Sequence, residues 1–310
     1  MKKMDNTGSE TVNIKNISVA GGGAMGSGIA HVFALNGFKV NVALRSTSSP
    51  EKVLASISKN MDRQIEKGFV TAENKKAALD RIFFYTSLEK ATDDADMLIE
   101  ALPENAALKK EFFSKADNVC PPHTIIASTT SAISITQLAS VTKRTDKVIG
   151  MHFMNPVQVS NLVEVIRGFA TSHTVTTSVM NLAKQIGKTP VEVNDYPGFI
   201  ASRLLAVQLN EAIFALYEGV AGVQEIDTVM NLGMAYKMGP LQLADFIGLD
   251  IVLNVINVLN DGYGNPKFAP CPLLVNMFNA GHLGVKSGKG FYEYVPGTKE
   301  IKAVSVFINK

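Results

Sequence analysis

The sequence predicts an α/β fold, a doubly wound and mostly parallel β-sheet, followed by a smaller domain made only of helices. From about residue 14, short apolar runs alternate with helical stretches, which is typical of parallel strands joined by helices. After about residue 200 the pattern is helical throughout. Between the two parts, Asp195-Tyr196-Pro197-Gly198 contains the Pro and Gly that punctuate structure, so we expect a hinge there.

Short apolar runs form the expected sheet. They cover residues 17–20, 40–44, 82–85, 96–100, 124–128, 148–153 and 162–166. Helical stretches separate them at 26–36, 51–67, 104–117 and near 175–187. We divide the chain into a polar tail (1–13), an α/β domain (14–195), a helical domain (196–295) and a C-terminal tail (296–310), whose residues allow one added strand.

Composition and charge describe an ordinary globular protein. With 46% hydrophobic residues, a net charge of +2 and no long Lys/Arg block, the chain carries no signal for nucleic acid. No apolar run reaches the roughly 20 residues that span a bilayer, and no apolar core follows Lys2 and Lys3. We therefore expect a cytoplasmic protein that binds no membrane. Cys120 and Cys271 lie far apart and form no CxxC, so we interpret them as buried small side chains.

The first expected strand runs into a glycine-rich loop and then into an apolar helix. In a GxGxxG loop the first Gly permits a tight turn, the second lets the backbone approach a pyrophosphate, and the third lets the helix pack closely on the strand. The pyrophosphate then lies at the helix N-terminus. The strand–turn–helix context predicts a Rossmann-type dinucleotide-binding domain, with candidate binding residues Gly21, Gly23, Ala24, Met25 and Gly26.

The second expected strand bears on which dinucleotide is bound. In NAD-binding domains an Asp or Glu about 20 residues after the glycines accepts hydrogen bonds from the ribose. Here the strand ends at Leu44, Arg45 and Ser46 follow, and no acidic residue occurs between Gly26 and Glu51. Arg and hydroxyl donors bind a 2′-phosphate that a carboxylate repels. We expect contacts from Leu44, Arg45 and Ser46 and a preference for NADP(H), with NAD(H) open as the second choice. The alternative is a solvated Arg45 and a Leu44 that packs on the adenine.

Several distinct motifs follow one another along both domains, from Ile17 to about Tyr294. They are GGGAMGSGIAHVFA, IEALPEN, ASTTSAISIT, DKVIGMHFMNPV, LVEVIRG, PGFIASRLL, MGPLQLADFIGLD and GVKSGKGFYEY. Together they resemble the 3-hydroxyacyl-CoA dehydrogenases, especially the bacterial 3-hydroxybutyryl-CoA dehydrogenases. The resemblance implies an oxidoreductase that acts on an acyl-CoA with a nicotinamide cofactor. It also implies a homodimer that forms through the helical domain, which contributes to substrate binding.

A histidine suits the proton transfer that accompanies hydride transfer at a secondary alcohol, since its unperturbed pKa of about 6.5 lies near working pH. His152 ends an expected strand at the carboxyl edge of the sheet, where such folds bind ligands. Glu164 is flanked by Val163 and Val165, where an unpaired carboxylate is costly to bury. The resemblance implies that Glu164 orients His152 as the catalytic acid/base and that Ser131 hydrogen-bonds the substrate's 3-oxygen. A purely structural role for His152 is the alternative.

Two positions depart from the family's usual pattern. The family commonly has SNTSSL where this chain has STTSAI, so Thr129 stands where an amide is usual. It commonly has PGF(I/V)xNR where this chain has PGFIASR, so Ser202 replaces an Asn that helps to bind substrate. Serine keeps a donor and an acceptor but reaches less far, which calls for a bridging water or a shifted substrate. These departures bear on substrate choice and rate more than on reaction class.

The resemblance also implies roles for three charged residues. Glu104 and Lys109 match positions near the ribose and nicotinamide of the cofactor, although a Glu in a first helical turn is favourable in any case. Lys67 matches a basic contact to the CoA phosphate. Asn155 is expected to fix local backbone geometry. The other histidines lack metal-ligand spacing, so we predict no metal site: they are His31, His123, His173 and His282.

The glycine loop and the resemblance together imply an NAD(P)-dependent (S)-3-hydroxyacyl-CoA dehydrogenase for short chains such as 3-hydroxybutyryl-CoA and acetoacetyl-CoA. Two alternatives stay open. One is a related dehydrogenase for another 3-hydroxy acid, such as 3-hydroxyadipyl-CoA or a sugar acid. The other is a non-catalytic dinucleotide-binding homologue. Ser131, His152 and Glu164 argue against this second alternative, while Ser202 argues slightly for it.

Overall fold

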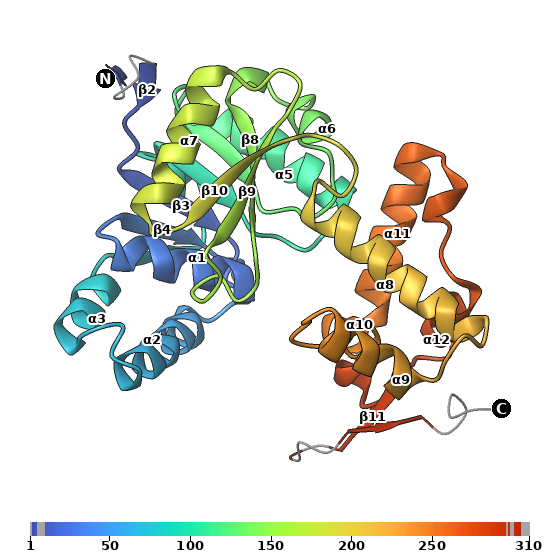
Figure 1. Ribbon diagram of the computed structural model, residues 1–310. Helices are drawn as coiled ribbons and strands as arrows, with labels where there is room; N and C mark the ends of the chain where they lie inside the picture. The colour runs from blue at the N-terminus through green and yellow to red at the C-terminus, as the bar shows by residue number, and fades with distance from the viewer. Residues whose placement is uncertain (1, 5–9, 296, 298–300, 305–310) are drawn as a thin grey trace. The chain divides into compact units, whose positions relative to one another are not determined.

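The computed structural model describes residues 2–4, 10–295, 297 and 301–304. The chain divides into two compact units, Met1–Tyr196 and Pro197–Lys310 (Figure 1). The first unit holds the large sheet, and the second is helical apart from a small two-stranded sheet. The predicted fold class is therefore confirmed.

The large sheet of the first unit has its first strand near the middle. Its strands are β3 (Asn16–Ala20), β4 (Lys39–Ala43), β5 (Ile82–Tyr85), β6 (Met97–Glu100), β7 (Ile125–Ser128), β8 (Val148–Phe153), β9 (Leu162–Arg167) and β10 (Thr189–Asn194). They lie in the order β10-β9-β8-β7-β6-β3-β4-β5. All neighbours are parallel except β8 and β9, which pair antiparallel. Chain direction therefore reverses once across the sheet, between β8 and β9.

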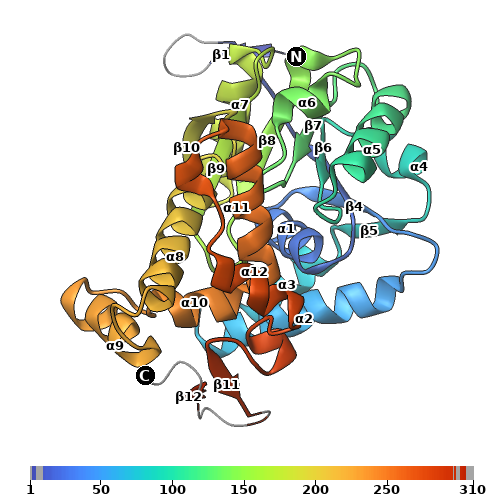
Figure 2. The ribbon, with the colours of Figure 1, turned by 90° about the vertical axis from the view of Figure 1, so that its right-hand side faces the viewer.

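Helices cover both faces of this sheet. They are α1 (Ala24–Leu35), α2 (Pro50–Glu66), α3 (Ala72–Leu79), α4 (Leu88–Thr92), α5 (Ala106–Val119), α6 (Ile135–Ala139) and α7 (His173–Gln185), with a 3₁₀ turn, η1 (Thr145–Lys147). Residues of α1, α2 and α7 share one core cluster with the strands, while α4, α5 and α6 lie on the opposite face (Figure 2).

Local sequence explains where most of these helices begin. A Ser, Thr or Asn precedes the first turn and its side chain accepts a hydrogen bond from a backbone N–H of that turn, which satisfies a donor that the helix itself leaves unpaired. These capping residues are Ser49, Thr71, Ser87, Asn105, Ser134 and Ser172. The helix α1 differs, because it begins at Gly23 without a side-chain cap.

The second unit is built on helices with their own core. They are α8 (Ala201–Tyr217), α9 (Val223–Thr228), the π-helical turn η2 (Val229–Gly233), α10 (Pro240–Ile247), α11 (Leu249–Tyr263), η3 (Pro266–Phe268), α12 (Pro272–Asn279) and η4 (Val285–Ser287). The strands β11 (Tyr292–Tyr294) and β12 (Ile301–Ala303) pair antiparallel. A similar small pair, β1 (Lys2–Met4) and β2 (Glu10–Val12), lies in the segment expected as a polar tail. Within the described residues no single helix is long and apolar enough to cross a membrane; α10 and α11 pass that test only together, with a 97° bend between them.

Two buried aspartates tie β11 to α10 inside the helical unit. Asp227 accepts hydrogen bonds from the backbone N–H groups of Leu241 and Gln242 and from the Tyr292 hydroxyl. Asp245 accepts bonds from the N–H groups of Phe291 and Tyr292 and from the Tyr294 hydroxyl. Each carboxylate therefore satisfies backbone donors that would otherwise be buried without a partner.

Candidate active site

The glycine loop between β3 and α1 has the local geometry that its sequence predicts. Gly21 has φ +114°, and a Cβ there would lie 2.6 Å from the Ala101 carbonyl oxygen. A Cβ on Gly26 would lie 2.0 Å from the Gly21 carbonyl oxygen, so α1 packs directly on the turn. A Cβ on Gly23, in contrast, would meet no described atom within 4 Å. Packing of the chain thus explains two of the three glycines and leaves Gly23 facing open space.

This arrangement fits the pyrophosphate of a dinucleotide. The first N–H groups of α1 lack intrahelical partners, and the first turn, from Ala24 through Met25, contains no acidic residue that would oppose an anion. A glycine with open space beside it, at a helix N-terminus after the central strand, is what close approach of a phosphate requires. The candidate binding residues lie between the end of β3 and the first turn of α1, and their contact with the cofactor stays a prediction: they are Gly21, Gly23, Ala24, Met25 and Gly26.

The residues after β4 lie beside this loop. Leu44 is buried, and a Cβ on Gly22 would lie 2.5 Å from its Cδ2 atom, so Leu44 packs under the glycine loop. Arg45 and Ser46 follow in an exposed turn closed by a hydrogen bond from the Ser48 N–H to the Arg45 carbonyl at 2.9 Å. Leu44 also lines a pocket of about 290 Å³ at the carboxyl ends of β4 and β5; its other walls are Pro50, Phe84, Tyr85, Thr86, Ser87 and Lys90.

His152 and Glu164 form a cross-strand pair on β8 and β9. The antiparallel register sets them directly opposite each other, and His152 Nδ1 lies 2.7 Å from Glu164 Oε2. Their exposed fractions are 7% and 2%. A carboxylate in contact with a buried imidazole fixes the ring's orientation and stabilises its charged form. The pair thus holds the imidazole of His152 in one orientation; its role in proton transfer stays a prediction.

The loop that joins β8 to β9 is held by a buried lysine that the sequence analysis missed. Lys188 Nζ donates to the carbonyls of Val157 at 2.6 Å and Ser160 at 2.5 Å. Burial lowers the pKa of Lys188. Val157 in turn packs against α1, since a Cβ on Gly28 would lie 2.9 Å from it. Asn155, expected to fix backbone geometry here, precedes Pro156 across a cis peptide bond.

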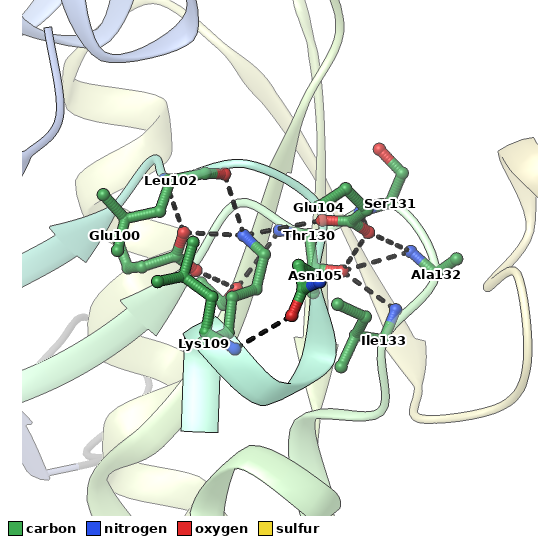
Figure 3. Close-up of polar contacts among 11 residues, drawn as sticks. Glu100, Leu102, Glu104, Asn105, Lys109, Thr130, Ser131, Ala132 and Ile133 are labelled. Atoms are coloured by element: carbon green, nitrogen blue, oxygen red, sulfur yellow. Dashed lines mark hydrogen bonds and ion pairs between the residues drawn. The ribbon is translucent and has the colours of Figure 1, made fainter. Parts of the chain in front are cut away.

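Ser131 lies in the loop between β7 and α6, where Glu104 meets the backbone (Figure 3). Glu104 Oε1 accepts hydrogen bonds from Thr130 Oγ1 at 2.5 Å, from the Ser131 N–H at 3.0 Å and from the Ala132 N–H at 3.2 Å. The side chain of Ser131 points away from Glu104 (Figure 3). Thr129, which replaces the family's usual amide, is buried and donates its N–H to the Glu100 carbonyl at 3.0 Å.

Lys109 lies in the interior beside this loop rather than at the surface. Its exposed fraction is 1%, and its Nζ lies 2.6 Å from Glu100 Oε1 and 3.5 Å from Glu104 Oε2. Direct contact between Lys109 and the cofactor stays a prediction. Glu100 is another residue that sequence reasoning missed. The available signal was a carboxylate at the end of an apolar strand with a Lys nine residues later.

The far side of the Ser131 loop is anchored by Asp195. Its carboxylate accepts bonds from Ser134 Oγ at 2.7 Å and from the N–H groups of Ile135 at 3.0 Å and Thr136 at 2.7 Å, which begin α6. Asp195 follows β10, so the end of the edge strand fixes the helix that follows Ser131. From the sequence alone, Asp195 is predicted only to lie in the hinge.

The remaining predicted residues lie on other elements. Lys67 is an exposed residue at the C-terminal end of α2. Ser202 is the second residue of α8 in the helical unit. The chain enters α8 through two positive φ angles, +72° at Gly198 and +51° at the buried Phe199, a region of backbone conformation that favours glycine.

Comparisons with known proteins agree with this division into units. Residues 16–196 match the model of the 3-hydroxyacyl-CoA dehydrogenase NAD binding domain, and residues 198–294 match that of the 3-hydroxyacyl-CoA dehydrogenase C-terminal domain. A probable 3-hydroxybutyryl-CoA dehydrogenase of Bacillus subtilis is 52% identical over 283 residues, which cover 91% of this chain and 98% of that protein. The 3-hydroxybutyryl-CoA dehydrogenase of Bradyrhizobium diazoefficiens is 45% identical, over 91% of this chain and 96% of its own length.

A solved structure is similar over nearly the same span. The crystal structure of (S)-3-hydroxybutyryl-CoA dehydrogenase from Ralstonia eutropha has a TM-score of 0.89 and 43% identity, and the match covers 91% of this chain and 100% of that one. The prediction of a nicotinamide cofactor is confirmed by the match to the NAD binding domain. The choice between NAD(H) and NADP(H) stays a prediction, as do the roles of His152 and Glu164. Because both domain models match in order along the chain, the protein belongs to the 3-hydroxyacyl-CoA dehydrogenase family.

Proposed function

We propose that this chain interconverts (S)-3-hydroxyacyl-CoA and 3-oxoacyl-CoA, with short substrates such as 3-hydroxybutyryl-CoA and acetoacetyl-CoA. The observation that carries the proposal is the buried His152–Glu164 pair, with 2.7 Å between Nδ1 and Oε2. The names of the relatives in Bacillus subtilis and Bradyrhizobium diazoefficiens support the short-chain substrate.

The chain's own residues supply the proton chemistry. When bound, the reduced nicotinamide supplies the hydride that adds to carbon 3 of the 3-oxoacyl group. His152, charged and donating from Nδ1 to Glu164, transfers a proton from Nε2 to the 3-oxygen. The Ser131 hydroxyl donates a hydrogen bond to the same oxygen and stabilises the negative charge that develops there. In the oxidative direction neutral His152 accepts the hydroxyl proton.

The reaction is tested by following reduced-nicotinamide absorbance with acetoacetyl-CoA and, in parallel, with 3-oxoadipyl-CoA. We expect turnover with acetoacetyl-CoA at the higher kcat/KM. Faster turnover with 3-oxoadipyl-CoA would indicate that the chain is a dehydrogenase for a different 3-hydroxy acid. Absence of turnover with either substrate and either cofactor would contradict the assignment as an enzyme and favour a non-catalytic dinucleotide-binding role.

We further propose that the preferred cofactor is NADP(H). The support is the exposed turn that begins with Arg45 and Ser46 directly after β4, together with the lack of any Asp or Glu between Gly26 and Glu51. Lys90 adds a second cation at the pocket that Leu44 lines. A 2′-phosphate on the ribose would meet positive charge and hydroxyl donors here, where an NAD-specific site offers a carboxylate.

The cofactor proposal is tested by kcat/KM for NADPH and NADH in the wild type and in Arg45→Ala. We expect the wild type to prefer NADPH, and Arg45→Ala to lower kcat/KM for NADPH by roughly tenfold or more, since charge-assisted bonds contribute about 1.5–3 kcal/mol. NADH use should change little. Arg63→Ala, at an exposed position on α2, is the matched control. Equal or better use of NADH by the wild type would contradict the proposal.

We also propose that the chain forms a homodimer through the helical unit. Large apolar side chains are exposed on that unit, among them Leu204, Leu232 and Phe246. A groove of about 600 Å³ on the same unit is lined mainly by α8, and α9, η2, α10 and η3 add further apolar side chains. Exposed large apolar side chains beside a groove support a subunit interface on this unit. Light scattering should give the dimer mass for the wild type and for Phe69→Glu in the first unit, and the monomer mass for Leu232→Glu. A monomer mass for the wild type would contradict the proposed homodimer.

A further inference from the structure

We propose that Glu104, held in place by Lys109 and Glu100, is a positioning residue that fixes the conformation of Ser131. The proposal rests on the role of Ser131 given under the proposed function, and it adds three residues that act through that serine. The observation behind it is a cluster of charges beside the loop between β7 and α6, in which Glu100 and Lys109 are buried and Glu104 is partly exposed (Figure 3).

The contacts of Glu104 lie on both sides of the Ser131 Cα atom. The Ser131 N–H belongs to the peptide plane before this Cα, and the Ala132 N–H belongs to the plane after it. Both donate to the same oxygen, Glu104 Oε1, at 3.0 and 3.2 Å. Rotation of either peptide plane would break one of these bonds and leave a backbone N–H without this acceptor. Glu104 therefore sets φ and ψ of Ser131, and with them the direction of its Cα–Cβ bond.

The hydroxyl of Thr130 completes the fixation of the loop. Thr130 Oγ1 donates to Glu104 Oε1 at 2.5 Å and accepts a bond from the Ile133 N–H at 2.9 Å. The backbone N–H groups of Ser131, Ala132 and Ile133 therefore all donate to the Glu104 carboxylate or to the Thr130 hydroxyl. Ser131 lies in the bend that these bonds hold, and its side chain points away from the cluster (Figure 3).

Lys109 and Glu100 connect Glu104 to the sheet. Lys109 Nζ lies between the two carboxylates, 2.6 Å from Glu100 Oε1 and 3.5 Å from Glu104 Oε2. Glu100, fully buried at the end of β6, also accepts bonds from the Leu102 N–H and from Ser128 Oγ, each at 2.6 Å. The ammonium between the two carboxylates attracts both of them. Lys109 therefore holds the Glu104 side chain in place beside the loop.

A positioning role differs in its consequences from direct contact with the cofactor. Lys109 is buried and contacts both carboxylates, so the proposal assigns its effect on the reaction to Glu104. If Glu104 acts through Ser131, its loss lowers kcat and leaves the affinity for the dinucleotide unchanged. If it acts as a cofactor contact alone, its loss weakens dinucleotide binding and leaves the loop in place.

The first test measures amide hydrogen exchange of the full chain over residues 129–134. In Glu104→Ala we expect exchange in this segment to rise by roughly tenfold or more, because the Ser131 N–H loses its acceptor and the Ala132 N–H keeps only its bond to Thr130 Oγ1 at 3.3 Å. Glu104→Gln, which keeps an acceptor oxygen, should retain part of the protection. Glu111→Ala, at an exposed site on α5, is the matched control and should exchange as the wild type does. Unchanged exchange in Glu104→Ala would overturn the proposal.

The second test is a double-mutant cycle in kcat for acetoacetyl-CoA reduction. We expect Glu104→Ala to lower kcat by roughly tenfold in the wild-type background, since small misplacements of a catalytic group are costly. In the Ser131→Ala background the same change should cost less than about twofold. A full-size effect in both backgrounds would overturn the proposal. If Ser131→Ala alone leaves kcat unchanged, the role of Ser131 in the proposed function is wrong, and the exchange experiment still decides whether Glu104 fixes the loop.

Discussion

Single residues carry the proposed chemistry, and Glu164 illustrates how far sequence reasoning reaches. A carboxylate flanked by Val163 and Val165 indicated a buried group that needs a partner. The identity of that partner came only from the resemblance, because the sequence does not show whether β9 runs parallel or antiparallel to β8. The structure supplies it, since the antiparallel register of β8 and β9 sets Glu164 opposite His152.

We expect Glu164→Gln to lower kcat by roughly two orders of magnitude, because a neutral amide no longer stabilises the charged imidazole or fixes its orientation. The matched control is Glu192→Gln on the neighbouring strand, where the side chain is exposed and lies 3.6 Å from Arg167 Nε. Steady-state rates with acetoacetyl-CoA, together with circular dichroism to check folding, measure the effect. A folded Glu164→Gln variant with wild-type kcat would contradict the pairing's role.

Other site residues were beyond the reach of the sequence for a physical reason. Glu100 and Lys188 act through contacts with residues far along the chain or with backbone carbonyls. Neither kind of contact leaves a pattern in residue type or spacing. Lys109 was assigned by family position to the cofactor, and its burial between Glu100 and Glu104 became visible only in three dimensions.

Whole elements were predictable where both faces are buried. The strand β8, at 148–153, is buried at every position and was expected with these bounds. The edge strand β10, in contrast, has mostly exposed or half-buried residues, so its sequence TPVEVN lacks an apolar run. Short helices such as α6 escape periodicity as well, because they span little more than one turn and depend on the capping residues Ser134 and Asp195.

Asp245, whose hydrogen bonds link α10 to β11, makes the free energy of unfolding depend on pH. Burial raises the pKa of Asp245 from 3.8 to about 6, against the hydrogen bonds that it accepts. Because the folded pKa lies above the unfolded value, the folded state binds more protons between them. This contribution to the free energy of unfolding is therefore fully present below about pH 4 and is lost as pH rises through about 6. Its size is on the order of 3 kcal/mol, at about 1.4 kcal/mol per pKa unit.

We expect Asp245→Asn to remove this dependence, because an amide does not ionise. Urea denaturation between about pH 4 and pH 7 should show that the free energy of unfolding falls less steeply in the variant than in the wild type, whatever its absolute value. Asp261→Asn, at an exposed site on α11, should follow the wild type. Equal slopes for Asp245→Asn and the wild type would contradict the assignment.

At the scale of the whole molecule, the topology of the first unit gathers the site. The glycine loop follows β3, Leu44 follows β4, Ser131 follows β7 and His152 lies near the end of β8. These four strands are parallel, so their carboxyl ends meet at one edge of the sheet. Alternation of strands and helices was enough to predict this edge, whereas the distances between the groups on it required the structure.

Ligand binding to this edge should stabilise the folded chain. A ligand at about 100 times its Kd contributes about 2.7 kcal/mol to the free energy of unfolding when it binds only the folded state. At equal concentration we expect NADP⁺ to raise the thermal unfolding midpoint more than NAD⁺ does. Arg45→Ala should reduce the difference, while Arg63→Ala should preserve it. A larger shift with NAD⁺ in the wild type would contradict the assigned cofactor preference.

The most direct test of the account is kcat for acetoacetyl-CoA reduction in His152→Gln. A general acid contributes about 10²–10⁴-fold to rate, so we expect kcat to fall by that factor while the Kd for the dinucleotide stays as in the wild type. His173→Gln, at an exposed site at the start of α7, serves as the matched control. A His152→Gln variant that keeps kcat within about twofold of the wild type would contradict the claim that His152 is the acid/base of this reaction.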